Sequence, residues 1–331
     1  MMIKETSQPY EYYSTVMEKQ VDWLWYPFIP YGKLTLLQGD PGEGKSTFII
    51  NIAAALTTGG MLPNGIKVSE PITVIYQCAE DSLQDTIKPR LVEAGADCNR
   101  VAFIVDTDQS LSIDDMRIEH CIKATGAKLF VLDPLQAYIK QDGDLQSATR
   151  MRSLMRRLSA VAEEYNCAIM LIGHLNKTAG GKSLYRGLGS IDIAAIARSV
   201  LMITRDSRNS EIRYMYPIKS SLAPEGYGIS FLLDPETGFH WIGKSLFRGV
   251  ENTALPRSTL SKRDRAKEIL TLMLSAEDVK SSDAFSRLNW LGISERTIRS
   301  AQKELGIEAY RRNNVWYLHL SREQSEECED E

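Results

Sequence analysis

The sequence has few cysteines and no long apolar run. Its five cysteines are scattered, and no C-x-x-C pair suggests a zinc site or a redox motif. No apolar stretch approaches the ~18 residues that a membrane-spanning helix needs, and residues 1–30 lack the apolar centre of a signal peptide. We therefore expect a soluble cytoplasmic protein with reduced thiols and no membrane partner.

An excess of charge of one sign is also missing from the chain as a whole. The 331 residues are 43% hydrophobic and 25% charged, with a net charge of -4, which excludes disordered and fibrous classes. The charge is uneven, however. Residues 257–320 carry 12 Lys and Arg against 8 Asp and Glu, whereas residues 321–331 carry 1 against 6. A small basic unit, which permits but does not establish nucleic-acid contact, precedes an acidic tail expected to be disordered.

The pattern between residues 31 and 243 predicts an α/β domain. Short β-branched runs alternate there with stretches of helical periodicity, which indicates parallel strands joined by crossover helices. The expected parallel strands are Lys33–Gln38, Ile72–Cys78, Val101–Val105, Lys128–Leu132, Ala168–Ile172 and Val200–Thr204. Three later runs are too close together for crossover helices and predict an antiparallel extension: Glu211–Lys219, Ile229–Leu233 and Phe239–Ile242.

Residues 39–46 read GDPGEGKS, a full match to the phosphate-binding pattern G-x-x-x-x-G-K-[ST]. The motif lies between a predicted strand and a predicted helix, as its chemistry requires. Glycines let successive backbone N–H groups turn toward phosphate oxygens, and the helix adds the positive end of its dipole. Lys45 should reach the β and γ phosphates of ATP, and the Ser46 hydroxyl should ligate Mg²⁺. The predicted nucleotide contacts are Gly39, Asp40, Pro41, Gly42, Glu43, Gly44, Lys45, Ser46 and Thr47.

Two acidic residues follow other predicted strands. Asp133 ends the run LFVLDP at the carboxyl edge of the sheet, where its carboxylate can approach Mg²⁺ through a water molecule. The alternative is a cap before Pro134. Glu80 follows the strand Ile72–Cys78 and is the candidate that polarises the attacking water. Its alternative role is only to begin the next helix.

An ordered set of segments resembles a known family. The segments are WLWYPFIPYGKLTLLQGDPGEGKST, QCAEDS, LFVLDPLQAY, LIGHLNK, YRGLGSIDIAAIARSVL and YPIKSSLAP. Over about residues 20–243 they resemble the RecA-like ATPases of the plasmid RepA and DnaB hexameric helicase group, in the branch found on mobile elements. The resemblance implies that Glu80 activates water, that Asp133 is the second acidic motif and that His174 senses the γ phosphate. Without it, a lone His at a strand end is equally compatible with a structural role.

The resemblance also implies contact with single-stranded DNA. Residues 176–190 are Gly-rich and include Lys177, Lys182 and Arg186. They resemble the loop by which these ATPases hold a phosphate backbone without reading bases. The alternative is an ordinary surface loop.

Self-assembly is implied in the same way. Arg198 matches by spacing the arginine that RepA-type helicases insert into the neighbouring subunit's site. DnaB-type enzymes use a Lys-x-Arg pair instead, and this sequence reads Lys219-Ser220-Ser221 at that place. Arg198 is therefore the candidate finger and Lys219 its assistant. A finger acting between subunits implies a ring or a filament of this chain, and a hexameric ring is the expected form.

Residues 261–320 resemble a winged helix. They predict helices Arg263–Leu274, Ser281–Leu291 and Ser294–Leu305, and then two strands around Asn313-Asn314. Candidate contacts to duplex DNA are Arg296, Arg299, Lys303, Arg311 and Arg312. A protein-docking role stays open, because fold alone does not define function. Trp290, Trp316 and Tyr317 are expected in the core.

These features divide the chain into five parts and favour one function. The parts are an N-terminal segment (1–30), a RecA-like ATPase domain (31–243), a linker (244–260), a winged-helix-like domain (261–320) and an acidic tail (321–331). The favoured function is that of a DNA-associated ATP hydrolase using Mg²⁺, a motor or helicase-type remodeller of a replication or mobile-element module. Its partners would be replication or mobilisation proteins. The alternative is a non-motor ATP-dependent switch that loads another protein on DNA.

Overall fold

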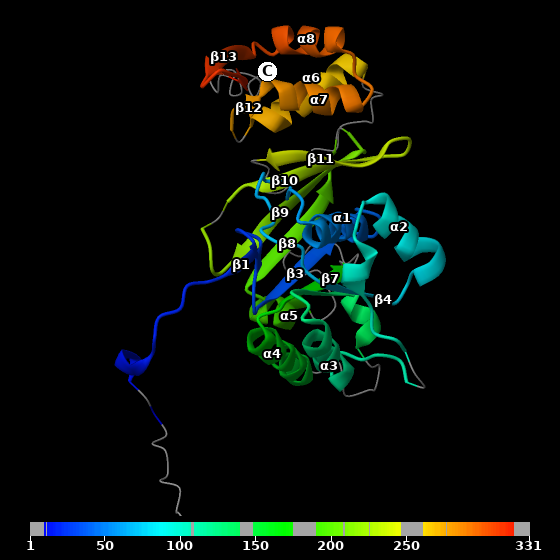
Figure 1. Cartoon of the computed structure of the whole chain (residues 1–331), viewed down its shortest axis with the longest axis vertical. Helices are drawn as coiled ribbons and strands as arrows, with labels where there is room; N and C mark the ends of the chain where they lie inside the picture. The colour runs from blue at the N-terminus through cyan, green and yellow to red at the C-terminus, as the bar shows by residue number, and fades with distance from the viewer. Residues whose placement is uncertain are drawn as a thin grey trace, which may run out of the picture.

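One nine-stranded sheet forms the centre of the structure (Figure 1). The structure is a computed structural model that describes residues 10, 12–106, 109–139, 148–174, 190–207, 209–224, 226–245, 261–275 and 277–320. The strand order is β11-β10-β9-β8-β3-β7-β6-β4-β5. The parallel strands are β3 (Leu34–Gly39), β4 (Val74–Cys78), β5 (Val101–Ala102), β6 (Leu129–Asp133), β7 (Ala168–His174) and β8 (Ser199–Arg205).

The other three strands form an antiparallel extension beside β8. They are β9 (Ile212–Ser220), β10 (Gly228–Asp234) and β11 (Gly238–Ser245). We call this part the sheet extension. The predicted α/β class, with a mostly parallel sheet of RecA-like type and an antiparallel extension, is confirmed. All nine predicted strands are present, although β5 is shorter than expected.

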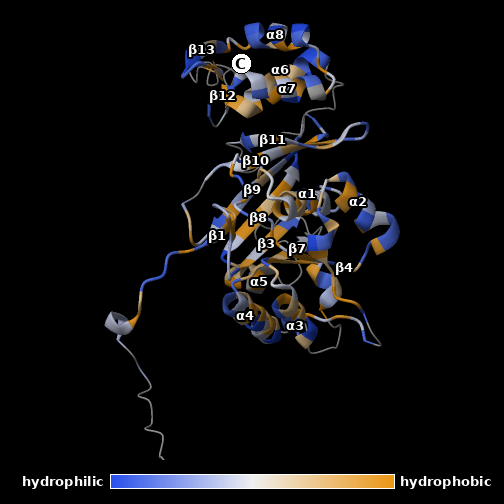
Figure 2. Ribbon diagram, in the orientation of Figure 1, coloured by the Kyte–Doolittle hydropathy of each residue, from blue (hydrophilic) through white to orange (hydrophobic). Residues whose placement is uncertain are grey.

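Helices cover both faces of the parallel part. The helices α1 (Lys45–Thr58) and α2 (Lys88–Glu93) lie on one side, and α3 (Met116–Thr125), α4 (Ala148–Tyr165) and α5 (Ser190–Ile196) on the other (Figure 1). Neighbouring residues of β3 point to opposite faces of the sheet. Leu37 therefore packs in the apolar cluster that includes α1, and Leu36 packs in the cluster that includes α4. Burial on both faces explains why the central strands are mainly apolar, as the prevailing orange in Figure 2 shows.

Part of the N-terminal segment packs against this core. A two-stranded hairpin of β1 (Trp23–Trp25) and β2 (Ile29–Pro30) was not predicted from the sequence. Trp25 is 1% exposed and packs against Phe28 and Phe48. Short helical turns complete this part of the chain: η1 (Tyr13–Thr15), η2 (Leu83–Ile87), η3 (Cys98–Arg100) and η4 (Leu135–Tyr138). Within the described residues, no helix is long and apolar enough to cross a membrane.

Residues 261–320 form a small helical unit with its own three-stranded sheet. In chain order it contains α6 (Lys262–Leu274), β12 (Val279–Lys280), α7 (Ser281–Trp290), α8 (Glu295–Glu304), β13 (Glu308–Arg312) and β14 (Val315–His319). The antiparallel sheet has the order β12-β14-β13, and β12 was not predicted. We call residues 261–320 the C-terminal unit. Its three helices and its hairpin agree with the predicted elements.

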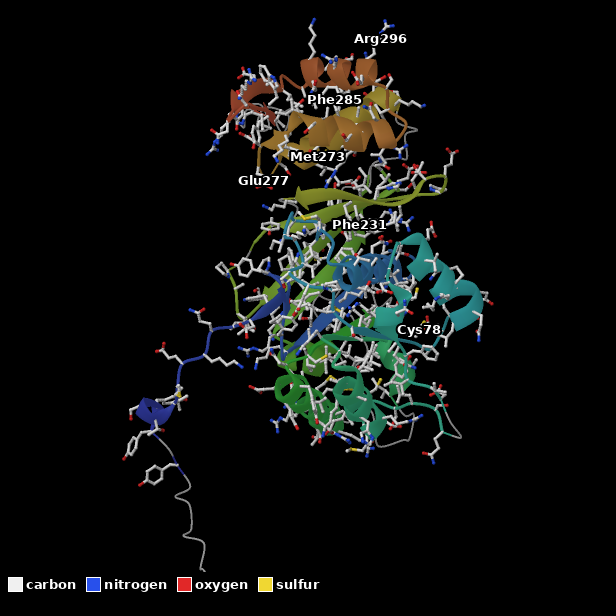
Figure 3. The ribbon with its side chains drawn as sticks, viewed as in Figure 1. Cys78, Phe231, Met273, Glu277, Phe285 and Arg296 are labelled. Carbon is white, nitrogen blue, oxygen red and sulfur yellow. The ribbon has the colours of Figure 1, made fainter. Side chains whose placement is uncertain are left out.

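The C-terminal unit and the sheet extension share one apolar core. Ile269 and Met273 of α6 cluster with Tyr214 and Leu232 of the extension. Phe231, next to Leu232, points to the opposite face of the sheet and packs in the cluster that includes α1. Figure 3 shows Met273 at the side of α6 that faces β11. The C-terminal unit therefore covers a face that the helices of the parallel part leave open.

One expectation about the C-terminal unit is wrong. Trp316 was expected in the core, yet it is 53% exposed. Leu318, which lies on the same face of β14, is 2% exposed. Trp316 pairs with Arg311 next to the Asn313-Asn314 turn, at the outer end of the hairpin. The tip of the hairpin has too few neighbours to bury a large ring.

Candidate nucleotide site

The phosphate loop has the geometry that its sequence predicts. Gly44 has a φ of +86°, and a Cβ there would lie 2.5 Å from Leu233 Cδ1 of β10. Glycine adopts this positive φ without strain, and α1 begins at the next residue, Lys45. The Lys45 side chain is buried, and its Nζ donates hydrogen bonds to the Gly39 and Asp40 carbonyls, both at 2.8 Å. Burial lowers the pKa of Lys45, while the charge of Asp133 raises it.

Two arginines hold the loop, Arg205 at the end of β8 and Arg213 on β9. Arg205 Nε lies 3.3 Å from Glu43 Oε1, and Arg205 Nη2 donates to the Gly42 carbonyl at 3.2 Å. Arg213 Nε lies 3.7 Å from the other Glu43 oxygen. Burial lowers the pKa of Arg213, and the charge of Arg205 lowers it further, while Glu43 raises it. Neither arginine was predicted, because each is distant in sequence and belongs to no local motif.

Asp133 ends β6 and is 4% exposed. The hydroxyl of Tyr76 on β4 donates a hydrogen bond of 2.6 Å to Asp133 Oδ2. The Ser46 side chain interacts with the same hydroxyl. Burial, followed by the charge of Asp133, holds the pKa of Tyr76 well above its usual value. Tyr76 was not predicted, because a tyrosine inside an apolar strand resembles ordinary core.

Ser46 and Asp133 fit the requirements of Mg²⁺. Both offer hard oxygen donors, and Tyr76 links them. In the part of the chain that the structure describes, no group of three or more His, Cys, Asp and Glu could hold a metal by itself. Mg²⁺ in nucleotide sites needs only one or two protein ligands, because waters and phosphates supply the rest.

Glu80 and His174 meet at the same edge of the sheet. Glu80 follows β4, its side chain is 63% exposed, and its Oε2 lies 3.9 Å from His174 Nε2 at the end of β7. Burial, followed by the charge of Lys45, lowers the pKa of His174, which favours the neutral imidazole. The strand β6 lies between β4 and β7, so Asp133 at its end lies at the same edge of the sheet as these two groups.

A hollow of about 460 Å³ adjoins α1, just beyond the phosphate loop. We call it the α1 hollow. Its walls come from α1, from α2 and from the turn between β10 and β11. The lining residues are Thr47, Ile50, Asn51, Arg90, Glu93, Ala94, Leu233, Asp234, Pro235, Thr237, Gly238, Phe239 and His240. Of these only Thr47 was predicted, because the walls come from three separate stretches of sequence.

Arg198 and Lys219 lie away from this edge. Arg198 is exposed and immediately precedes β8, at the amino end of a strand parallel to β3. The phosphate loop follows the carboxyl end of β3, so Arg198 lies at the opposite edge from the phosphate loop of its own chain. Lys219 Nζ donates to the carbonyls of Ala194, Ala195 and Ala197, at 2.7, 3.1 and 2.8 Å. Its ammonium thus caps the end of α5, and an assisting role in catalysis stays a prediction.

The predicted DNA contacts fall into two groups. Lys177, Lys182 and Arg186 lie outside the described residues. The side chains of the second group are all exposed on α8 or on the hairpin: Arg296, Arg299, Lys303, Arg311 and Arg312. Arg296 projects from α8 on the side away from the large sheet (Figure 3). The structure therefore leaves the second group accessible.

The fold and the phosphate loop define a RecA-like P-loop nucleotide-binding protein. A family model described as an AAA domain matches residues 14–180, just over half of the chain. The chain belongs to this AAA domain family.

Curated relatives include proteins named DNA repair protein RadA. That of Mycobacterium tuberculosis is 26% identical over 159 residues, covering 46% of this chain and 30% of the relative. That of Streptococcus pneumoniae is 28% identical over 149 residues, covering 44% of this chain and 31% of the relative. The match thus spans about a third of these relatives' length. A solved KaiC-like protein from Pyrococcus horikoshii OT3 covers 64% of this chain and 90% of its own, with 21% identity and a TM-score of 0.46.

Proposed function

We propose that this chain hydrolyses ATP with Mg²⁺. The observation that carries the proposal is the meeting of Lys45, Asp133, Glu80 and His174 at one edge of the sheet. Lys45 would hold the β and γ phosphates, while Ser46 and Asp133 would hold Mg²⁺, which neutralises phosphate charge. Glu80 would orient and polarise the attacking water, and His174 would contact the γ phosphate from the adjacent strand.

The α1 hollow is the candidate site for the nucleoside. It begins at Thr47, two residues after Lys45, so a nucleotide bound at the loop would extend into it. The Arg90 guanidinium lies in its wall and is held by Asp81 at 2.9 Å. A guanidinium plane can stack on a purine base.

We also propose that the chain acts as a ring, expected to be a hexamer, in the RepA and DnaB branch of RecA-like ATPases. The opposite-edge position of Arg198 supports this assembly. An exposed guanidinium there cannot reach its own phosphate loop but can reach that of an adjoining copy.

DNA is the proposed partner of the ring. The basic side chains of α8 and of the hairpin support a winged helix that binds duplex DNA, with Arg296 and Arg311 among the phosphate contacts. The relatives named as DNA repair proteins support a DNA-associated role. Helicase activity, a mobile-element or replication module and a cytoplasmic location stay predictions from the sequence.

The test is ATP hydrolysis by the full chain, with and without single-stranded DNA. We expect turnover that requires Mg²⁺ and rises with DNA. Glu80→Gln should bind ATP like the parent and hydrolyse it about 10²–10⁴ times more slowly, the usual contribution of general base catalysis. Tight ATP binding without turnover in the parent would favour the switch or loader instead, and no ATP binding would refute both functions.

A further inference from the structure

The turn that closes the α1 hollow is held by a residue of the C-terminal unit. This turn joins β10 to β11 and contributes Asp234, Pro235 and Thr237 to the hollow. Asp234 Oδ1 accepts hydrogen bonds from the backbone N–H groups of Glu236 and Thr237, at 2.8 and 2.9 Å. Asp234 therefore sets the shape of the turn.

The other oxygen of Asp234 binds α6. Arg265 Nη2 donates to Asp234 Oδ2 at 2.6 Å, and it also lies 3.0 Å from Glu211 Oε2. The side chains of Arg265 and Asp234 are only 21% and 9% exposed, so solvent screens this ion pair less than a surface pair. The guanidinium thus joins α6 to the end of β10 and to the start of β9.

Side chains alternate along β10, so the end of this strand contacts both the phosphate loop and α6. Leu232 packs in the core shared with α6, and Asp234, two residues later, lies on the same face as Leu232. Leu233 faces the other way and lies against Gly44 of the phosphate loop. The end of β10 is therefore held between the phosphate loop and α6.

We propose that Arg265 is a positioning residue for the nucleoside end of the nucleotide site. It acts through Asp234 and the β10–β11 turn, and it makes α6 of the C-terminal unit a part of the nucleotide-binding apparatus. This inference rests on the proposed binding of ATP at the phosphate loop. It adds that the C-terminal unit, besides any DNA contact, tunes affinity for the nucleoside.

The test compares Arg265→Gln with Lys267→Gln. Both variants remove one positive charge from α6, but among the described residues Lys267 pairs only with Asp264 and Glu304, both inside the C-terminal unit, at 2.9 and 3.1 Å. Calorimetry with Mg²⁺ would measure the Kd of ATP, ADP and inorganic tripolyphosphate for each full-length chain. The last ligand occupies the phosphate loop without a nucleoside.

Arg265→Gln should weaken ATP and ADP about tenfold, the scale of one hydrogen bond to a charged group, and leave tripolyphosphate unchanged. Lys267→Gln should change none of the three, and Arg265→Lys, which keeps the cation, should recover part of the loss. In steady state, Arg265→Gln should raise KM for ATP more than it lowers kcat.

Three results would overturn the proposal. Parental ATP affinity in Arg265→Gln would show that the turn needs no anchor. Equal weakening of ATP and tripolyphosphate would show that Arg265 only supports the fold. If the parent chain itself binds neither ligand, the proposed function fails as well, so the two failures are distinguishable.

Discussion

The Tyr76 hydroxyl donates a 2.6 Å hydrogen bond to Asp133 Oδ2, although the two residues are 57 positions apart in sequence. The strands β4 and β6 are neighbours in the sheet, and Tyr76 lies two residues before the end of β4. The hydroxyl occupies one lone pair of Oδ2 and leaves Oδ1 without this bond. Tyr76 can therefore orient Asp133 toward Mg²⁺.

Tyr76→Phe should weaken Mg²⁺ binding about 10- to 100-fold, as expected for loss of a hydrogen bond that orients a metal ligand. A titration of fluorescent ADP binding against Mg²⁺ would measure the shift. Tyr165→Phe is the matched control, because the Tyr165 hydroxyl also donates a hydrogen bond to a carboxylate, Glu119 Oε1 at 3.1 Å, on the α3 and α4 side of the sheet. An equal Mg²⁺ midpoint in Tyr76→Phe and in the parent would contradict this role.

Arg198→Ala should abolish ATP hydrolysis while ATP binding persists. A transition-state arginine contributes about 10³–10⁵ in rate in other P-loop enzymes. Mixing this variant with Lys45→Ala should restore part of the activity, because one subunit then supplies the finger and its neighbour the intact loop. Turnover per subunit should also rise with protein concentration. A rate independent of concentration, with no recovery in the mixture, would place the action of Arg198 within one chain.

Asp234 should stabilise the fold only above acidic pH. Burial tends to raise its pKa, but the hydrogen bonds from Arg265, Thr237 and Glu236 prevail and lower the pKa from 3.8 to about 2. Because the folded pKa is below the unfolded one, this stability is present above about pH 4 and is lost as pH falls through about 2. Its size is about 2 kcal/mol.

Asp234→Asn should therefore lower the free energy of unfolding by about 2 kcal/mol at pH 7. The difference from the parent should shrink between pH 4 and pH 2, as measured by urea unfolding. Glu236→Gln, at an exposed position of the same turn, is the control and should have little effect. A pH-independent difference for Asp234→Asn would mean that the charge of Asp234 is not its source.

Ile269→Ala should destabilise the sheet extension together with the C-terminal unit. Ile269 is 1% exposed in the shared core, and such a truncation costs about 2–5 kcal/mol. Denaturant unfolding followed by tryptophan fluorescence should show one weakened transition. The control Ile66→Ala is at a site 42% exposed. Two transitions, with only one of them affected, would show that the C-terminal unit folds independently.

Neutralising the hairpin arginines should weaken binding to duplex DNA uniformly across sequences. For Arg311→Gln combined with Arg312→Gln, we expect the slope of log K against log salt to fall by about 1 for each lost phosphate contact. Arg263→Gln, a surface arginine on α6 that pairs with Glu304 at 3.0 Å, is the control. An unchanged salt slope in the double variant would favour docking of a protein partner, for which the exposed Trp316 is available.

The sequence by itself determined the phosphate loop, the strands and the edge at which the acidic groups lie. These features are local. GDPGEGKS spans consecutive residues, and Glu80 and Asp133 each follow a short apolar run that is typical of a buried strand. The predicted roles of Arg198 and Lys219 depended on spacing alone.

Only the tertiary structure decided which distant residues join the site. The sheet order β8-β3-β7-β6-β4 differs from the order of these strands along the chain, so lateral neighbours such as Tyr76 and Asp133 do not follow from local pattern. The exposure of Trp316 depended on how far the hairpin extends beyond its helices. Arg265 illustrates the same physical reason: its role comes from an ion pair between a helix and a strand end, and charge pairing across a fold has no sequence period.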